Sequence, residues 1–312
     1  MTRKNHETIF VSIASYRDPD CVNTVRSLFR MATHPERLVI GICWQFAPGK
    51  EPALLQLFDY QEKFRQISLP ASDSRGPCLA RHLAQQLFQG EDYYFQIDSH
   101  MRFASGWDEL LIRLLSACPS QKPVLSTYPL PLKDGSEPAE DALVEIKPRY
   151  FDEHGILTQH STLHRMPDPP PAPSRCCFVS AGMLFARGEV VREVPYDPHL
   201  YFTGEEIILA LRLWTSGWDI YNPNAVVAYH NYQLETDRRR HWEDQAGWTR
   251  LNRLSVERIA HLTGQRPAGG PEALADLDRY GLGAERSLGR YQEISGLDFK
   301  ARTWHGKPID KP

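Results

Sequence analysis

The stretch that decides the fold is Glu91-Asp-Tyr-Tyr-Phe-Gln-Ile-Asp-Ser-His100. Residues 93 to 97 form a short aromatic and β-branched run that follows turn-prone residues, a pattern typical of a buried strand. Asp98 and His100 stand at the carboxyl end of this strand, with only Ser99 between them. Because ligands of open α/β sheets bind outside the carboxyl ends of the strands, we expect a functional site here.

A carboxylate and an imidazole two residues apart, on a strand end that bends, can both reach one divalent cation. Such an ion holds a diphosphate and neutralises the charge that a diphosphate gains when it leaves as a product. The same residues are also typical of an ordinary turn in which Asp98 caps the next segment. Since a three-residue match is common by chance, the choice between the two interpretations depends on the rest of the chain.

The composition is that of a globular protein and does not indicate a nucleic-acid or membrane partner. The 312 residues suffice for one large α/β domain with additions or for two domains, and 41% of them are hydrophobic. The net charge of -3 predicts neither nucleic-acid binding nor a polybasic membrane surface. No apolar signal region or membrane span is predicted, and the six scattered cysteines are typical of reduced thiols, so we expect a cytoplasmic protein.

Strands and helices alternate through the first half of the chain. The pattern predicts a helix that Asp18 opens as N-cap, another at residues 54–64, one after Arg75-Gly76-Pro77 and one at 107–117. Strands are predicted at residues 8–15, 38–44, 67–69, 93–97 and 124–127. This alternation favours an α/β fold with a largely parallel sheet that helices cover on both faces.

The second half is more varied. Prolines accumulate over residues 129–173, and the run from Met166 to Pro173 is incompatible with helix or central strand, so we expect an insertion or flap over a site. A helix follows Glu206, and an apolar strand ends at His230. We therefore predict a main domain over residues 1–234 and a mainly helical extension over residues 235–312.

Several motifs resemble, in their order and spacing, those of one class of enzymes. They are Arg75-Gly76 with Leu79-Ala80-Arg81, Asp98-Ser99-His100, Trp107, Gly204-Glu205-Glu206 and His230. The set resembles the GT-A-fold glycosyltransferases whose metal motif is Asp-x-His, such as the polypeptide N-acetylgalactosaminyltransferases. Residues 11–19 (Val-Ser-Ile-Ala-Ser-Tyr-Arg-Asp-Pro) and 98–103 (Asp-Ser-His-Met-Arg-Phe) are more similar to the GlcNAc-transferase family, whose characterised members modify hydroxyproline on a cytoplasmic ubiquitin-ligase subunit. The resemblance covers about residues 8 to 232.

This resemblance implies a UDP-sugar donor, first of all UDP-GlcNAc, and a divalent metal ion. Asp98 and His100 match the metal motif, and His230 matches the later histidine that completes it, although a single histidine of this kind is more often structural. A site rich in imidazole suits Mn²⁺ better than Mg²⁺, which prefers oxygen ligands only.

The resemblance also implies residues that contact the donor. Ala14, Ser15 and Tyr16 are expected to face uracil and ribose, and Arg17 is expected to reach a phosphate. Two further arginines are candidates for the diphosphate or sugar, or are solvated helix charges: Arg75 and Arg81. The acidic pair that meets donor-sugar or acceptor hydroxyls corresponds to Glu205 and Glu206, although the helix macrodipole alone favours acids at such a position.

The chemistry needs stabilisation of the leaving diphosphate, which a metal ion and an arginine supply. The family is expected to retain the anomeric configuration, with the departing phosphate taking the acceptor proton. An inverting reaction would instead need Glu205 or Glu206 as base, and the sequence leaves both open. The acceptor hydroxyl, on a protein, a glycan or a small molecule, is also open.

Three alternatives remain beside this hypothesis. The first is transfer of another UDP-hexose, namely GalNAc, galactose or glucose. The second is a non-catalytic protein that binds nucleotide sugars or carbohydrates. The third, a metal-dependent nucleotidyltransferase, ranks low because the turn after the first strand lacks the glycines of a phosphate loop.

Overall fold

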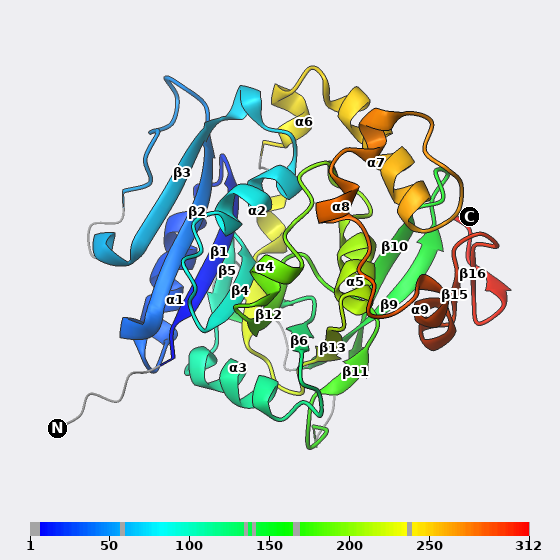
Figure 1. The fold of residues 1–312 in the computed structure, drawn as a ribbon. Helices are drawn as coiled ribbons and strands as arrows, with labels where there is room; N and C mark the ends of the chain where they lie inside the picture. The colour runs from blue at the N-terminus through cyan, green and yellow to red at the C-terminus, as the bar shows by residue number, and fades with distance from the viewer. Residues whose placement is uncertain are drawn as a thin grey trace.

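The structure, a computed structural model, describes residues 7–56, 60–133, 137–138, 142–164, 169–235 and 239–311. An eight-stranded sheet runs through the molecule in the order β11-β13-β6-β12-β4-β1-β2-β3 (Figure 1). The strands are β1 Ile9–Tyr16, β2 Leu38–Phe46, β3 Phe64–Pro70, β4 Tyr93–Asp98, β6 Pro123–Ser126, β11 Ser174–Cys176, β12 Met183–Arg187 and β13 Asp219–Asn222. The fold is therefore mixed α/β, as predicted.

The sheet is mostly parallel. Strands β4, β1, β2 and β3 run in one direction, as do β6 and β13, whereas β12 lies antiparallel between β4 and β6. Because β12 is antiparallel to β4, with Met183 opposite Ile97, the start of β12 lies beside the carboxyl end of β4. Register also places Ala14 of β1 opposite Asp98. Three strands thus meet at the edge where Asp98 stands.

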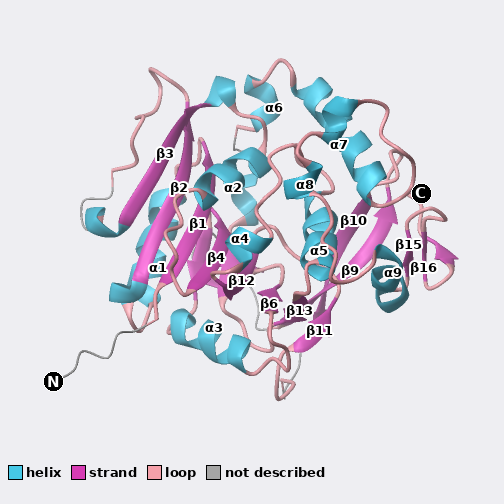
Figure 2. Ribbon diagram, viewed as in Figure 1, coloured by secondary structure: helices cyan, strands magenta, loops and turns pink. Residues whose placement is uncertain are grey.

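Helices cover both faces of the sheet (Figure 2). On one face lie α2 (Pro77–Gln85), α4 (Val190–Glu193) and α5 (Glu205–Thr215), and on the other lie α1 (Cys21–Met31) and α3 (Trp107–Ser116). Successive side chains of a strand point to opposite faces. Accordingly Tyr94 packs in the core under α5, while its neighbour Phe95 packs in the core under α1 and α3.

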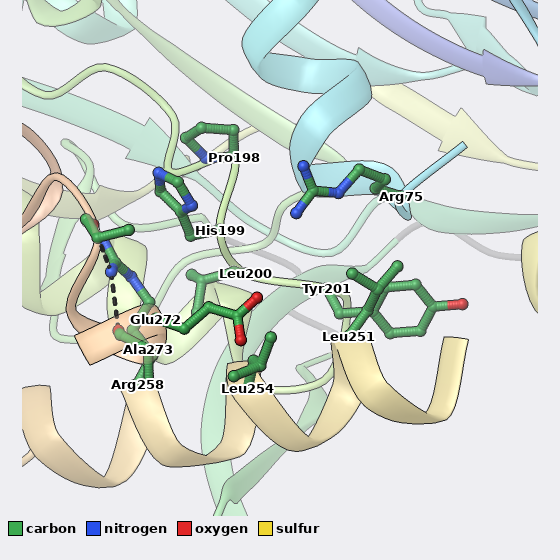
Figure 3. Close-up of a pocket in the computed structure, with 11 residues that line it drawn as sticks. Arg75, Pro198, His199, Leu200, Tyr201, Leu251, Leu254, Arg258, Glu272 and Ala273 are labelled. Carbon is green, nitrogen blue, oxygen red and sulfur yellow. Dashed lines mark hydrogen bonds between the residues drawn. The ribbon is translucent and has the colours of Figure 1, made fainter. Parts of the chain in front are cut away.

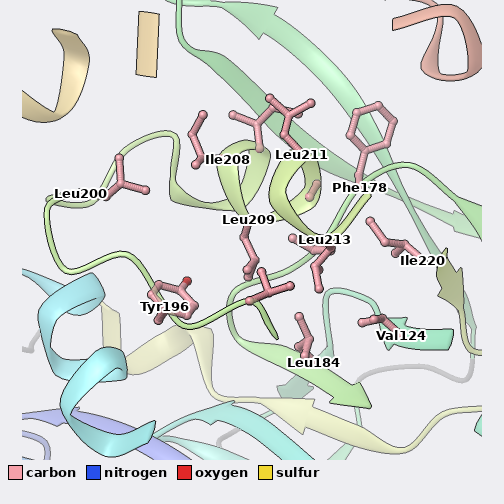
Figure 4. Close-up of a cluster of buried hydrophobic side chains, with 14 of the residues drawn as sticks. Val124, Phe178, Leu184, Tyr196, Leu200, Ile208, Leu209, Leu211, Leu213 and Ile220 are labelled. Atoms are coloured by element: carbon pink, nitrogen blue, oxygen red, sulfur yellow. The ribbon is translucent and has the colours of Figure 1, made fainter. Parts of the chain in front are cut away.

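The larger core joins α5 to the sheet and to the C-terminal part of the chain. Ile208, Leu211 and Leu213 of α5 are fully buried against residues of β6 and β12, such as Val124 and Leu184 (Figure 4). Val256 and Ile259 of α7 and Tyr291 of α9 belong to the same cluster. This core fixes α5, which begins with the acidic pair, relative to the strand ends.

The C-terminal residues form η4 Tyr232–Glu235, α6 His241–Asp244, α7 Trp248–Leu262, η5 Pro271–Leu274, α8 Leu277–Tyr280 and α9 Leu288–Ser295. A small sheet of β15 (Leu297–Asp298), β16 (Thr303–Trp304) and β17 (Lys307–Pro308) follows. Arg258 of α7 forms a buried ion pair with Asp197, at 2.7 Å between Nε and Oδ2. Residues beyond 235 thus share a core with the preceding part of the chain.

The predicted helix at residues 54–64 is wrong for the described residues there. Only η2, a short turn at Gln61–Lys63, precedes β3. Residues 52–55 instead lie along the sheet edge because side chains of the strands satisfy their backbone: Trp44 Nε1 donates to Pro52 O at 2.8 Å, and Leu55 N donates to Gln66 Oε1 at 3.0 Å. Residues 57–59 lie outside the described part.

The predicted N-cap role of Asp18 is also wrong. Helix α1 begins at Cys21, two residues later than the sequence suggests. One oxygen of Asp18 accepts the backbone N–H of Asp20 at 2.9 Å, but the other is directed at His100, at 2.7 Å from its Nδ1. A long-range partner therefore takes the carboxylate that local pattern assigns to the helix.

Much of the segment 129–173 is regular. It contains β7 (Leu130–Lys133), β8 (Glu137–Pro138) and a long antiparallel hairpin of β9 (Leu143–Phe151) and β10 (Leu157–His164). Strands β7 and β8 join β14 (Ala228–His230) and β5 (Met101–Phe103) in a four-stranded sheet. The proline run begins outside the described residues, since these exclude 165–168. Across the described chain, none of the helices combines the length and apolar character needed to cross a bilayer.

Candidate active site

A cleft of about 670 Å³ opens at the carboxyl ends of β1 and β4. Its floor comes from the strand ends and its walls from the start of α5, from β10 and from α6. The lining includes Ala14, Tyr16, Arg81, Asp98, His100, Tyr128, Gln159, Ala181, Glu205, Glu206, His230 and Trp242. Most of the residues predicted from the sequence thus meet in one cavity.

Asp98, His100 and His230 form a cluster in this cleft. Each offers one ligand atom, and these atoms lie within 4.8 Å of one another. Strand pairing explains how the distant His230 arrives: β14 is antiparallel to β5, with His230 opposite Met101. The two imidazole rings therefore lie 4.3 Å apart between centroids, and His230 Nε2 is 3.4 Å from Asp98 Oδ2.

These residues fit a divalent cation. One carboxylate and two imidazoles form a mixed oxygen and nitrogen set of the kind that Mn²⁺ and similar ions accept. Burial alone would raise the pKa of Asp98, but the hydrogen bond from His230 and the charge of Arg81 hold this pKa well below its ordinary value. Gly182 leaves the carboxylate its space, because a Cβ there would lie 2.5 Å from Asp98 Oδ2.

Arg81 connects the cluster of Asp98, His100 and His230 to the acidic pair. Its Nη2 lies 2.9 Å from Asp98 Oδ1 and its Nη1 lies 2.7 Å from Glu205 Oε1. Glu205 also accepts hydrogen bonds from Cys78 Sγ at 2.9 Å and from Tyr196 OH at 3.1 Å. The hydrogen bonds of the Glu205 carboxylate therefore fix it in its ion pair with Arg81.

Glu206 has a different environment. Tyr128 OH donates to its Oε2 at 2.6 Å, Gln159 Nε2 donates to the same atom at 2.9 Å, and the backbone N–H of Ala181 donates to Oε1 at 2.9 Å. Burial nevertheless raises the pKa of Glu206 to about 7. This side chain can therefore exchange a proton near neutral pH.

The predicted donor residues at the end of β1 and just after it separate into two groups. Ala14 and Tyr16 line the cleft, whereas Ser15 is buried and Arg17 is not part of the lining. The Arg17 guanidinium pairs with Glu51 at 2.9 Å and with Asp244 at 2.8 Å. Its backbone has φ of 48°, a left-handed conformation that bulky residues seldom adopt. Arg17 therefore ties α6 to the end of β1.

Arg75 lies elsewhere. It lines a second pocket of about 220 Å³ with His199, Leu254, Arg258 and other residues of α7 and of the segment before α5 (Figure 3). Figure 3 shows its guanidinium turned toward that pocket. The structure thus brings Arg81, and not Arg75, to the cleft.

Sequence reasoning missed several residues of the cleft. Tyr128 lies between β6 and β7, and Gln159 belongs to β10, where no local pattern indicates a role. Trp242 and His241 come from α6, beyond the matched motifs; His241 Nδ1 lies 2.8 Å from Tyr201 OH, and burial lowers the pKa of His241 to about 4. Asp18 does not line the cleft but lies 2.7 Å from His100 Nδ1, and it did have a signal, because it lies within the opening motif.

The sequence matches the model of the family described as "Glycosyltransferase (GlcNAc)" over residues 8–59 and 53–301. A search of curated proteins gave no match. The solved structure of GalNAc-T7 with UDP, GalNAc and Mn²⁺ aligns with a TM-score of 0.60 and 14% identity, over 93% of this chain and 56% of that one. S. aureus TarS 1-349 in complex with UDP-GlcNAc aligns with a TM-score of 0.53 and 12% identity, over 96% of this chain and 73% of that one.

At these identities the structural likeness shows the fold. It confirms the predicted GT-A type of α/β fold. The chain spans about 56% of the length of the GalNAc-T7 chain that it matches.

Proposed function

This chain belongs to the glycosyltransferase (GlcNAc) family, and from that premise we propose that it transfers GlcNAc from UDP-GlcNAc to a hydroxyl acceptor with a divalent metal ion. The observation that carries the proposal is the cluster of Asp98, His100 and His230 in a cleft at the carboxyl ends of the strands. The cluster joins Asp98 of β4 and His100, two residues further on, to His230 of β14, which is distant in the sequence.

Asp98, His100 and His230 would hold the ion, and Mn²⁺ suits their mixed ligand set better than Mg²⁺. When bound, the ion would neutralise the charge of the departing diphosphate. Arg81 keeps Asp98 ionised and fixes its direction, at 2.9 Å between Nη2 and Oδ1. Ala14 and Tyr16 form the wall available to the nucleotide, and the Arg17 ion pair with Asp244 holds α6 over it.

The two glutamates favour retention of configuration. Glu205 is bound by Arg81, Cys78 and Tyr196, and Glu206 accepts three hydrogen bonds. Front-side attack needs no separate protein base, because the leaving phosphate takes the acceptor proton. If the reaction inverts, Glu206 is the base, since its pKa of about 7 matches that task.

The test is release of UDP. The protein is incubated with Mn²⁺ and a panel of UDP-sugars without acceptor, and we expect slow, metal-dependent hydrolysis of UDP-GlcNAc in preference to the GalNAc, galactose and glucose donors. Asp98→Ala and His100→Ala should abolish it with the fold intact, whereas His154→Ala, at an exposed histidine outside the cleft, serves as matched control.

A metal-dependent thermal shift with one donor and no turnover would favour the binding-protein alternative. If no donor gives turnover and no donor gives a thermal shift, the proposed function is refuted. Hydrolysis of another UDP-hexose would show that the donor sugar is not GlcNAc but would support the proposed transfer reaction.

A further inference from the structure

Asp18 lies in the turn between β1 and α1, and its carboxylate is almost completely buried beside the metal cluster, with 1% of the residue exposed. One oxygen, Oδ2, accepts a hydrogen bond from Ser99 Oγ at 2.5 Å and lies 2.7 Å from His100 Nδ1. The other oxygen, Oδ1, accepts the backbone N–H of Asp20 at 2.9 Å. Both oxygens are therefore fixed in direction.

A carboxylate at this distance from one ring nitrogen determines the state of the other. When the neutral imidazole of His100 donates its Nδ1–H to Asp18, Nε2 carries no proton and is the nitrogen that can bind a metal ion. Such a carboxylate partner also fixes the ring orientation and raises the basicity of the ligand nitrogen.

The backbone around His100 has a separate brace. Thr24 of α1 donates its Oγ1–H to Ser99 O at 2.8 Å and accepts the backbone N–H of Met101 at 2.8 Å. These two hydrogen bonds of Thr24 hold the backbone on both sides of His100 and do not involve the ring. The role of Asp18 is thus separable from that of its neighbours, because it acts on the imidazole itself.

We propose that Asp18 is a positioning residue of the metal site: it selects the tautomer of His100 and aims Nε2 at the ion that Asp98 and His230 share. The inference rests on the proposed metal dependence. Asp18 stands near the end of the opening motif, residues 11–19, and the proposal explains its presence there by the contact with His100 instead of by helix capping.

The experiment measures metal binding directly. Free Mn²⁺ is followed by electron paramagnetic resonance during titration of the wild type and of Asp18→Asn, His100→Ala and Thr24→Val, each with and without UDP. Asp18→Asn keeps the shape but can donate an N–H to Nδ1, which would favour the tautomer with a proton on Nε2. We expect Mn²⁺ affinity about 10- to 100-fold weaker in Asp18→Asn and less than about threefold weaker in Thr24→Val.

The visible absorption spectrum of bound Co²⁺ gives a second readout, because a merely structural role of Asp18 would not alter the ligand field. We expect a changed spectrum for Asp18→Asn and an unchanged one for Thr24→Val. Thermal unfolding without metal checks the fold of each variant. If Asp18→Asn does not fold, Asp18→Glu replaces it and should show a changed Co²⁺ spectrum.

The outcomes separate the two proposals. Wild-type affinity and spectrum in the folded Asp18 variant, together with loss of binding in His100→Ala, would overturn the role of Asp18 and leave the metal site in place. Wild-type affinity in His100→Ala, or no Mn²⁺ binding by the wild type with or without UDP, would overturn both the metal site and this inference.

Discussion

Replacement of Arg81 by methionine tests how the cleft is held together. The side chains of Arg81 and Glu205 are each 6% exposed, so Arg81→Met leaves a buried carboxylate without its cation. Breaking a buried pair in this way costs about 3–5 kcal/mol. Asp98 is 27% exposed, so the loss of its pair adds at most about 1 kcal/mol.

The hydrogen bonds to Glu205 from Cys78 and Tyr196 remain in the variant and reduce the penalty. We therefore expect Arg81→Met to lower the free energy of unfolding by about 3 kcal/mol, at the lower end of the range for buried pairs. The assay is urea-induced unfolding without metal, followed by circular dichroism. Arg175→Met is the matched control, because its pair with Asp219 involves an arginine side chain that is 63% exposed, and its expected loss is below about 1 kcal/mol.

A double-mutant cycle isolates the pair itself. Glu205→Gln combined with Arg81→Met leaves no charge unpaired between these two positions, so the double variant should be more stable than the sum of the single losses predicts. We expect a coupling energy of about 1–3 kcal/mol. A loss below about 1 kcal/mol in Arg81→Met, or additive losses in the cycle, would show that Glu205 is not a buried partner of Arg81.

Three further changes have defined outcomes. Gly182→Ala places a methyl group 2.5 Å from Asp98 Oδ2, so we expect Mn²⁺ affinity about 10-fold lower or worse in titration, and wild-type affinity would contradict the fit of the site. The pKa of Glu206 is raised from 4.5 to about 7 in the folded state, so its stabilising contribution is complete below pH 4.5 and is lost as the pH rises through about 7. Between about pH 4.5 and pH 8 the wild type should therefore lose about 1–3 kcal/mol relative to Glu206→Gln in urea unfolding, and parallel pH profiles would refute the shift. Leu211→Ala, at a side chain of α5 with no exposed surface, should cost about 2–5 kcal/mol in the same assay, and a loss below about 1 kcal/mol would mean that the core collapses around it.

Local pattern determined most of the architecture. The strands that contain residues 93–97 and 38–44 are short apolar runs rich in aromatic or β-branched residues, and the helices after Gly76 and Gly204 begin after a glycine and are longer apolar segments, so the sequence was enough to predict them. The prediction of a helix at residues 54–64 failed for a different reason. Their backbone is satisfied by side chains of Trp44 and Gln66 on neighbouring strands, and local propensity contains no information about such partners.

The acidic pair shows how far a motif predicts a site. The sequence places Glu205 and Glu206 at the start of one helix, but adjacent residues of a helix point about 100° apart, because 3.6 residues make one turn. One side chain therefore meets Arg81, and the other meets Tyr128 and Gln159. Their different roles follow from these surroundings and not from their spacing.

The sequence by itself determined the α/β class and the strand that ends at Asp98, because these depend on residue type and local periodicity. The metal-ligand candidates Asp98, His100 and His230 came from the resemblance of its motifs to those of glycosyltransferases. Only the tertiary structure decided which residues share the cleft. It places Arg75 in a different pocket and pairs Arg17 with Glu51 and Asp244. It also shows Asp18 beside His100 instead of at the start of a helix. The physical reason is that a charged side chain takes the best partner within its reach in three dimensions, and strand pairing and helix packing set that reach.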